Sequence, residues 1–343
     1  GAGLIGGRLR QGSMNTTAFS FGPLGAKGFA FLNMLQLIGW TSIMIYDAML
    51  ALQELAPLSP MIWTIAIGAL VILWLFIGLH NTGYIQAIVS ILLLGLTLYM
   101  GAHMISQWPS EASLLTSGNM SFIAALELSI AMPLSWLPLI SDYTRESKKP
   151  FSASLTSATV YTVTSIVMYT LGLSAAIFGG GDSIITIMMN AGLGLAGLIV
   201  IIVSTVTTTF MDAYSAGVSS TTIYNGASSK GVAVIVTMVG TIAAMLYPMD
   251  DITDFLYLIG SVFAPMIAIL LADYFINRQP VQTVSAYLVR GLIWAVSVGL
   301  YHYMLHSEST IGATLPTFTM AFVVTAIVGF ISKTAHASSE IKQ

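Results

Sequence analysis

The sequence predicts an all-α integral membrane protein, and three observations point to this class: composition, hydropathy and the distribution of positive charge. Of the 343 residues, 56% are hydrophobic and 7% are charged, and the mean hydropathy is +0.87. Soluble domains carry roughly 25% charged residues, so this chain has too few charges to cover a soluble surface. The gaps between its apolar segments are too short for a soluble domain, which predicts a single membrane domain.

Ten apolar segments have the length of a membrane-spanning helix, which needs about 20 residues. Their predicted bounds are 28–52, 60–79, 84–106, 120–141, 151–178, 184–214, 231–248, 252–276, 284–305 and 311–332. The long sixth segment is compatible with a tilted or an interrupted helix. Gly1–Gly6 runs directly into the basic stretch Gly7–Arg10. This order is not that of a signal peptide, and it predicts the end of a membrane helix whose beginning is absent.

The positive charges predict how the segments cross the membrane. All 11 Lys and Arg residues fall on one side of an alternating ten-span arrangement. The opposite loops hold acidic residues, such as Glu54, Asp182 and Glu308. Lys and Arg are enriched in cytoplasmic loops. We therefore predict a multi-pass protein of the plasma membrane with both ends of the chain in the cytoplasm.

Several functional classes receive no support from the sequence. The net charge is −3 and no basic patch occurs, so nucleic acid is not expected as a partner. The absence of cysteine excludes disulfides, thiol catalysis and thiolate metal sites. The histidines show no ligand spacing, and none of the common nucleotide-binding or hydrolase motifs is found. We expect no enzyme activity, no cofactor beyond a coupling ion and a monomeric protein in the bilayer.

The fourth segment carries two prolines, in the stretch Met132–Pro138. Proline lacks a backbone donor and breaks the i→i−4 hydrogen-bond ladder. In lipid, the freed backbone groups need partners in the protein or in a water-filled cavity. Broken helices in transporters mark substrate and ion sites. We therefore predict that this helix is interrupted around Met132, Pro133, Ser135 and Trp136. The charged stretch that follows, Asp142–Lys149, also anchors the cytoplasmic end.

Four acidic residues lie within the predicted spans, where charges are costly and are candidates for function. Asp47 and Asp273 lie near segment ends, where solvation at the membrane interface explains them. Glu127 is equally compatible with a gating or structural hydrogen bond and with a substrate contact. Asp212 lies deeper in its segment and is a candidate for substrate binding or proton transfer.

The sixth segment also contains a run of hydroxyl side chains that includes Ser204, Thr207 and Thr208. Ser204 and Thr208 share a helix face. Such residues commonly bond back to their own helix, yet hydroxyl and carbonyl oxygens are also the ligands that small hard cations prefer. Trp40 and Trp136 lie inside spans rather than at the interfaces, so they are either packing residues or stacking partners for a flat ring.

Four motifs resemble the nucleobase:cation symporter family 1. They are LQLIGWTSIMIYD (35–47), AMPLSWLPLISDYTR (131–145), TTTFMDAYSAG (207–217) and LLADYFINR (270–278). This family includes cytosine permeases, hydantoin transporters and hydroxymethylpyrimidine transporters, and the second and third motifs are most similar to the last branch. The resemblance covers essentially the whole chain.

The resemblance implies a leucine-transporter-like bundle of five-plus-five inverted repeats followed by two further helices. It places residues 1–106 in the remainder of the first repeat, 120–276 in the second repeat and 284–332 in the additional helices. The family's first helix and most of its second are then missing. Residues 1–343 alone are therefore expected not to concentrate substrate, because inverted-repeat transporters form their site between the repeats.

The resemblance also implies roles for particular residues. The family's substrate-stacking tryptophan matches Trp40, and its sodium ligands match Ser204, Thr207 and Thr208. Trp136 lies a few residues later than the second tryptophan of hydantoin transporters. Cytosine permeases carry asparagines where this chain has Thr209 and Met211. Asp212 is accordingly expected to provide polar substrate recognition.

These observations predict a sodium-coupled importer of a pyrimidine-type heterocycle, with hydroxymethylpyrimidine as the first candidate. Within the same class, the alternatives are a proton-coupled permease for cytosine, purines, allantoin or hydantoins, in which Asp212 or Glu127 titrates. A channel or a non-transporting membrane scaffold are alternatives from other classes. A channel would favour a symmetric oligomer with a polar-lined pore, and no ring of charges is evident in the sequence.

Overall fold

The computed structural model describes residues 1–77, 79–106, 121–178, 194–307 and 311–340, together with Met189 and Gly192. These residues form helices and connecting turns, without a strand among them. The elements are α1 (Ala2–Leu9), α2 (Ser13–Thr16), α3 (Ala18–Leu55), α4 (Pro60–Ile77), α5 (Leu79–Ser106), α6 (Phe122–Thr144), α7 (Pro150–Phe178), α9 (Gly194–Ile223), α10 (Ser229–Leu246), α11 (Ile252–Leu271), the π-helix η1 (Ala272–Asn277), α12 (Val284–His306) and α13 (Thr314–Glu340).

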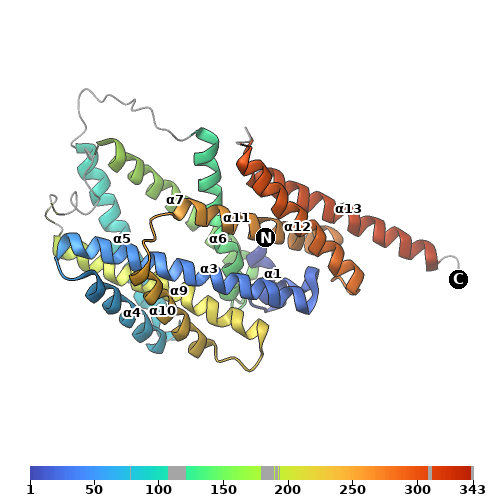
Figure 1. Cartoon of the computed structure of the whole chain (residues 1–343), viewed down its shortest axis with the longest axis horizontal. Helices are drawn as coiled ribbons and strands as arrows, with labels where there is room; N and C mark the ends of the chain where they lie inside the picture. The colour runs from blue at the N-terminus through green and yellow to red at the C-terminus, as the bar shows by residue number, and fades with distance from the viewer. Residues whose placement is uncertain are drawn as a thin grey trace.

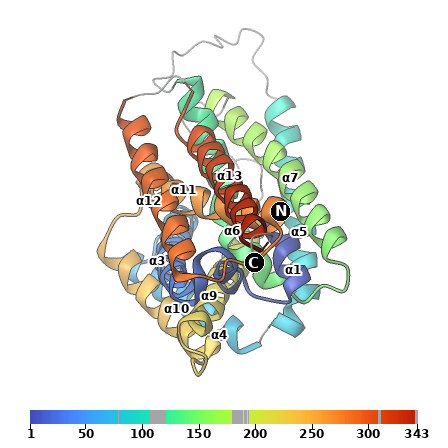
Figure 2. The same ribbon diagram turned by 90° about the vertical axis from the view of Figure 1, so that its right-hand side faces the viewer.

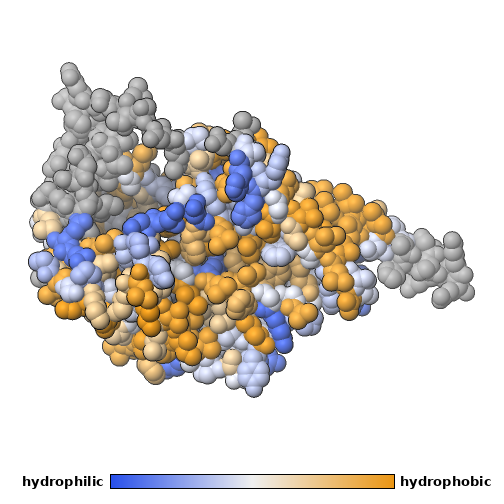
Figure 3. All heavy atoms as spheres, viewed as in Figure 1, coloured by the Kyte–Doolittle hydropathy of each residue, from blue (hydrophilic) through white to orange (hydrophobic). Residues whose placement is uncertain are grey.

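Within the described residues, ten spans are long and apolar enough to cross a membrane, which confirms the predicted number. The helix of the sixth span, α9, continues to Ile223 rather than ending at residue 214. The beginning of that predicted span, residues 184–193, lies mostly outside the described part of the chain. Apolar side chains gather over α4 and α10 and over α12 and α13 on the face drawn in Figure 3. Lipid is the solvent that suits such a surface.

Capping side chains fix where several spans begin. Ser121, Ser228, Asp251 and Thr283 each accept a hydrogen bond from the backbone N–H three residues later, at 3.1 to 3.3 Å. Short polar side chains are preferred at this position because they satisfy a backbone donor that the first turn leaves free. In α3 the straight helix follows Gly22, whose φ of 67° and ψ of 179° are not helical. Pro23 comes next and suits a first helical turn.

Helices α3 and α9 form a long antiparallel pair, drawn side by side in Figure 1. Leu37 packs in one core cluster with Ala216, and Ile45 packs in another with Ile202. Residues later in α3 therefore pack against residues earlier in α9, as expected for an antiparallel pair. Helices α4 and α10 pack on the same pair, so this side of the molecule is a four-helix layer.

Helices α12 and α13 lie next to each other and pack on α11, as Figure 2 shows from the side. We call α12 and α13 together the C-terminal hairpin. The indole N–H of Trp294 on α12 donates to the carbonyl of Val262 on α11 at 2.9 Å. The core cluster that contains Phe263, Met266 and Ile267 of α11 also includes Ile293 of α12 and Ala321 of α13. The hairpin is therefore attached to the bundle through α11.

The predicted interruption of the fourth span is wrong. Helix α6 is a continuous α-helix from Phe122 to Thr144, with Pro133 and Pro138 inside it. Each proline removes one backbone donor, which leaves the carbonyls of Ser129 and Leu134 without their usual intrahelical partner. The neighbouring turns hold the helix together, and the hydroxyl of Ser135 adds a 2.7 Å hydrogen bond to the carbonyl of Met132. The loss of two separate intrahelical hydrogen bonds weakens α6 but does not interrupt it.

A close approach between α9 and α10 gives a stability prediction. A Cβ atom on Gly217 would lie 2.1 Å from the carbonyl oxygen of Ser229, which is backbone and cannot swing away. We expect Gly217→Ala to lower the free energy of unfolding by about 1–3 kcal/mol through overpacking. Gly172→Ala on α7 is the matched control, because nothing lies within 4 Å of its Cβ position. Thermal unfolding of the detergent-solubilised variants provides the measurement, and equal midpoints for the two variants would contradict the expectation.

Candidate functional site

A polar face of α3 is buried in the bundle, where Asn33 contacts α9 and Trp40 contacts α11. Asn33, Gln36 and Trp40 follow a spacing of three and then four residues, so they lie on one face of the helix. Their exposed fractions are 0%, 5% and 8%. Two amides and an indole are unusual on the buried side of a membrane helix, since every buried polar group requires a partner.

These side chains form a short hydrogen-bonded chain that ends in a free acceptor. The Gln36 amide donates from Nε2 to Asn33 Oδ1 at 2.6 Å, and Asn33 donates from Nδ2 to the Ser219 hydroxyl at 2.8 Å. The remaining oxygen of Gln36, Oε1, is buried and has no hydrogen-bond partner among the described residues. Such an unpaired group costs about 1–3 kcal/mol, and a ligand with an N–H group would relieve this cost.

Asp212 lies at the same depth as Trp40. The Asn33–Ser219 hydrogen bond fixes the register of the antiparallel pair. Trp40 follows Asn33 by seven residues and Asp212 precedes Ser219 by seven. At about 1.5 Å per residue, each lies about 10 Å along its helix from that bond. Asp212 is 8% exposed, and within the described residues its carboxylate has no hydrogen bond or ion pair.

The two tryptophans have different neighbours. The Trp40 ring lies 5.4 Å from that of Phe255 on α11, at an interplanar angle of 73°. The Trp136 ring lies 6.3 Å from that of Tyr161 on α7. The structure does not bring the two indoles into contact among the described residues, so it provides no two-tryptophan sandwich. The edge contact with Phe255 orients the Trp40 ring.

Helix α6 meets α9 close to Asp212 through Tyr143. The Tyr143 hydroxyl donates to the carbonyl of Met211 at 3.0 Å and lies 3.3 Å from the Ser215 hydroxyl. Of the predicted α6 residues, Ser135 is buried, whereas Met132, Pro133 and Trp136 are half-buried. They lie more than a helical turn before Tyr143. The hydroxyl of Ser135 is engaged with its own helix, so the backbone carbonyls freed by proline are the more available polar groups.

Sequence reasoning did not find Asn33, Gln36 and Tyr143. A signal for the first two exists, since they are polar residues at helical spacing one and two turns before Trp40 in an apolar segment. Tyr143 lies in the motif that resembles the symporter family, but its spacing gives no indication of which helix it meets. That contact depends on how α6 crosses α9.

The hydroxyl run on α9 provides several neutral oxygens near one another. Thr207 donates from its hydroxyl to the Ser204 carbonyl at 2.9 Å, and this bond leaves its oxygen lone pairs available. The hydroxyls of Ser204 and Thr208, one turn apart, form no hydrogen bond with the described residues. Neutral hydroxyl and carbonyl oxygens suit a small monovalent cation such as sodium. These three residues fit part of a sodium site, and a complete site needs oxygens from another element.

Glu127 has a structural partner. Its carboxylate accepts the backbone N–H of Thr314, at 3.1 Å to Oε1 and 3.0 Å to Oε2, and the Thr314 hydroxyl at 2.5 Å. Glu127 therefore occupies the N-terminus of α13, where a negative charge is stabilised by the helix dipole. Of the two readings from sequence, hydrogen bonding to the protein matches this geometry better than a substrate contact.

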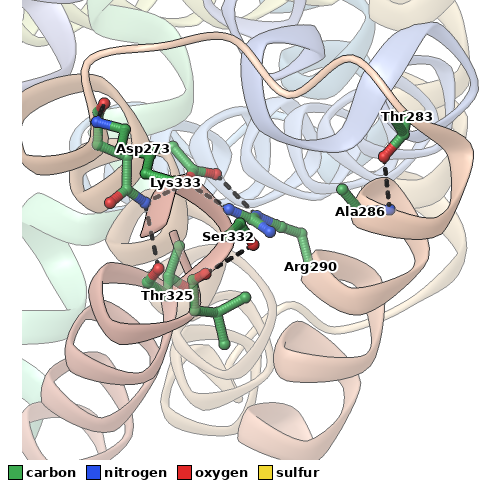
Figure 4. Close-up of polar contacts among 9 residues, drawn as sticks. Asp273, Thr283, Ala286, Arg290, Thr325, Ser332 and Lys333 are labelled. Atoms are coloured by element: carbon green, nitrogen blue, oxygen red, sulfur yellow. Dashed lines mark hydrogen bonds and ion pairs between the residues drawn. The ribbon is translucent and has the colours of Figure 1, made fainter. Parts of the chain in front are cut away.

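The expectation that interfacial water solvates Asp273 is wrong, whereas Asp47 is exposed as expected. Asp273 is 0% exposed and pairs with Arg290 of α12, as Figure 4 shows. Arg290 donates from Nη2 to Oδ1 at 3.0 Å and from Nε to Oδ2 at 3.3 Å. The sequence places Asp273 near a helix end, but packing of the C-terminal hairpin covers that end.

Ten membrane spans and a buried polar face on α3 define a helical membrane protein, and a comparison with a solved structure supports the leucine-transporter-like bundle that the motifs implied. In agreement, the fold matches a solved Na⁺-coupled sialic acid symporter in a substrate-bound, outward-open state, with a TM-score of 0.68. The match covers 94% of this chain and 76% of the symporter, at 15% sequence identity.

The sequence profile of the permeases for cytosine/purines, uracil, thiamine and allantoin matches residues 28–337, and the chain belongs to this family. The cytosine permeases of Escherichia coli strains K12, CFT073 and O157:H7 are 25% identical to it over 185 residues. That alignment covers 53% of this chain and 44% of each permease, so the match spans less than half the length of these relatives.

Proposed function

We propose that the protein containing this chain is a cation-coupled symporter that imports a pyrimidine-type heterocycle. The burial of Trp40 and Asp212 at one depth, with the unpaired Gln36 oxygen about one helical turn away, is the observation that supports it most directly. A flat ring stacks on the indole of Trp40, a contact worth about 0.5–1.5 kcal/mol beyond burial. Asp212 and Gln36 accept hydrogen bonds from its polar edge.

Hydroxymethylpyrimidine is the first substrate to test. It combines a flat aromatic ring with an amino group, which donates to two acceptors of the kind that Asp212 and Gln36 provide. Its hydroxyl group can bond to the freed α6 carbonyls near Met132, Pro133 and Ser135, with Trp136 at the edge of the pocket. Cytosine shares the ring and the amino group but lacks the hydroxymethyl group. The ratio of the affinities for hydroxymethylpyrimidine and cytosine therefore measures the contribution of α6.

Counterflow uptake tests the substrate. The intact protein that contains this chain is reconstituted in liposomes, and a panel of labelled pyrimidines, purines and hydantoins is exchanged against unlabelled hydroxymethylpyrimidine. Exchange of a pyrimidine supports the proposal. Exchange restricted to allantoin or hydantoins would assign the substrate to those compounds and not to the pyrimidines. Absence of exchange with the whole panel would count against a transporter of heterocycles.

Sodium is the proposed coupling ion, held in part by Ser204, Thr207 and Thr208. Proton coupling is the second candidate, since Asp212 is buried and has no partner among the described residues. Glu127 is a weaker proton candidate than Asp212, because two donor groups of Thr314 already bind its carboxylate. The family relationship and the charge pattern further support a plasma-membrane protein with both chain ends in the cytoplasm, and the proposal takes it to act as a monomer.

One pair of variants separates the two ions. Thr208→Ala removes one hard oxygen ligand, so the sodium concentration for half-maximal uptake is expected to rise several-fold, with little change in the pH dependence. Thr221→Ala, a threonine further along α9 whose hydroxyl bonds back to Val218 at 2.7 Å, is the control. Uptake that ignores sodium, follows pH and is abolished by Asp212→Asn would establish proton coupling instead.

A further inference from the structure

The C-terminal hairpin is joined to the end of α11 by a buried polar network, which we call the Asp273 lock (Figure 4). Asp273 has a bidentate ion pair with Arg290, whose side chain is 6% exposed. Asn277 donates from Nδ2 both to Asp273 Oδ1 at 2.8 Å and to the Thr325 carbonyl of α13 at 3.2 Å. Two side chains of η1 thus reach both helices of the hairpin, Asp273 through Arg290 of α12 and Asn277 through the Thr325 carbonyl of α13.

The backbone around the lock is shaped for this contact. Asp273 and Asn277 both lie in the π-helical turn η1, and such turns commonly occur at functional positions. A Cβ on Gly329 of α13 would lie 2.0 Å from Asn277 Nδ2, so glycine lets the amide reach α13. Lys333 donates from Nζ to the Asn277 carbonyl. Four polar groups from three elements therefore hold this end of the hairpin.

The opposite end of the hairpin meets α6 through a smaller contact, which we call the Glu127 clasp. It consists of the Glu127 carboxylate and the N–H and hydroxyl of Thr314, and the Tyr301 hydroxyl of α12 lies 3.3 Å from the Thr314 hydroxyl oxygen, which can accept its proton. Gly312 has a φ of +75°, and a Cβ there would lie 2.1 Å from Glu127 Oε1. Beyond this point α6 packs far more on α1 and α11 than on α13.

We propose that α11, η1 and the C-terminal hairpin form one rigid body and that the Glu127 clasp is the releasable contact by which this body holds the start of α6. The two contacts differ physically. The Asp273 lock pairs two buried charges, and parting them leaves both uncompensated. The clasp is also buried, since Glu127 is 5% exposed, but it binds one carboxylate to neutral donors at a helix end, and water can replace neutral donors once that end opens.

The inference extends the proposed function, because movement of the start of α6 relative to the hairpin would open or close one side of the transport path. The predicted difference between the lock and the clasp does not depend on any substrate. The chain contains no cysteine, so pairs of introduced cysteines carry spin labels without a background signal. Phe122→Cys with Leu315→Cys reports on the clasp, and Ile276→Cys with Phe330→Cys reports on the lock. These side chains are 79%, 52%, 53% and 67% exposed.

Dipolar electron paramagnetic resonance on residues 1–343 in nanodiscs measures both distances without substrate. Glu127→Gln weakens the clasp by removing the charge, and Gly312→Ala opens it from the other partner by steric overlap. Each is expected to add a longer-distance population to the 122–315 pair and to leave the 276–330 pair unchanged. Gly299→Ala, with nothing within 4 Å of its Cβ position, is the control and should change neither pair.

Two outcomes would overturn the inference. One is a 122–315 distance that is the same in the parent and in both variants, which would make the clasp dispensable. The other is equal broadening of the 276–330 pair, which would mean that the hairpin loosens as a whole. If Gly312→Ala does not fold, the two distances measured in Glu127→Gln still test the inference. This experiment measures no uptake. The expected change in the 122–315 distance would therefore support the inference even if the intact protein transports no heterocycle.

Discussion

Replacing Arg290 with methionine is expected to lower the free energy of unfolding by about 3–5 kcal/mol, because it leaves the charge of Asp273 buried without a partner. Asp273 is 0% exposed, and Arg290 is its ion-pair partner at 3.0 Å. Asn277 alone cannot compensate a carboxylate in an apolar environment. Equilibrium unfolding in mixed detergent micelles measures the loss.

The double variant Asp273→Leu with Arg290→Met is the critical comparison. Apolar residues of similar volume often replace a buried ion pair at no cost, so the double variant should regain most of the stability lost in the single variant. Lys148→Met serves as the control, since Lys148 is exposed and its removal should have little effect. If single and double variants unfold alike, the loss comes from packing of the arginine stem and not from the uncompensated charge.

Trp40→Ala is expected to weaken substrate binding by about 1–3 kcal/mol, or about 5- to 150-fold in Kd, through loss of a stacking surface and its burial. Phe255 lies on one edge of the indole, at 5.4 Å between ring centroids, and holds the ring in place. Trp40→Phe retains a smaller aromatic face and should lose only part of the affinity. Equilibrium binding of the labelled substrate to the purified intact protein gives the Kd.

The control for this experiment is Trp63→Ala, because the Trp63 indole donates to the Ala56 carbonyl at 3.1 Å near the start of α4. It removes the same type of side chain from a different core cluster, the one that contains Ile45 and Ala48 of α3. We expect its Kd to match that of the parent. An affinity unchanged by Trp40→Ala would remove Trp40 from the site, and equal losses in both variants would indicate general destabilisation.

The sequence by itself determined the membrane class, the number of spans and the family. These properties depend on local hydropathy and on motifs, which each segment carries whatever its neighbours are. The sequence also identified Asp212 as a buried acid, because a carboxylate well inside an apolar segment has little access to water. It likewise placed Trp40 inside an apolar segment and away from the interface, and the packing of α3 then buries its side chain.

Only the tertiary structure decided which side chains meet. Proline content predicted a broken α6, but the surrounding turns keep it helical. Glu127 and Asp273 lie in similar apolar contexts along the chain, yet one binds a helix N-terminus and the other an arginine. Trp136 packs toward α7 and not toward Trp40. Hydropathy sets the depth of a residue in the membrane, whereas its partner depends on helix rotation and crossing, which arise from packing between distant segments.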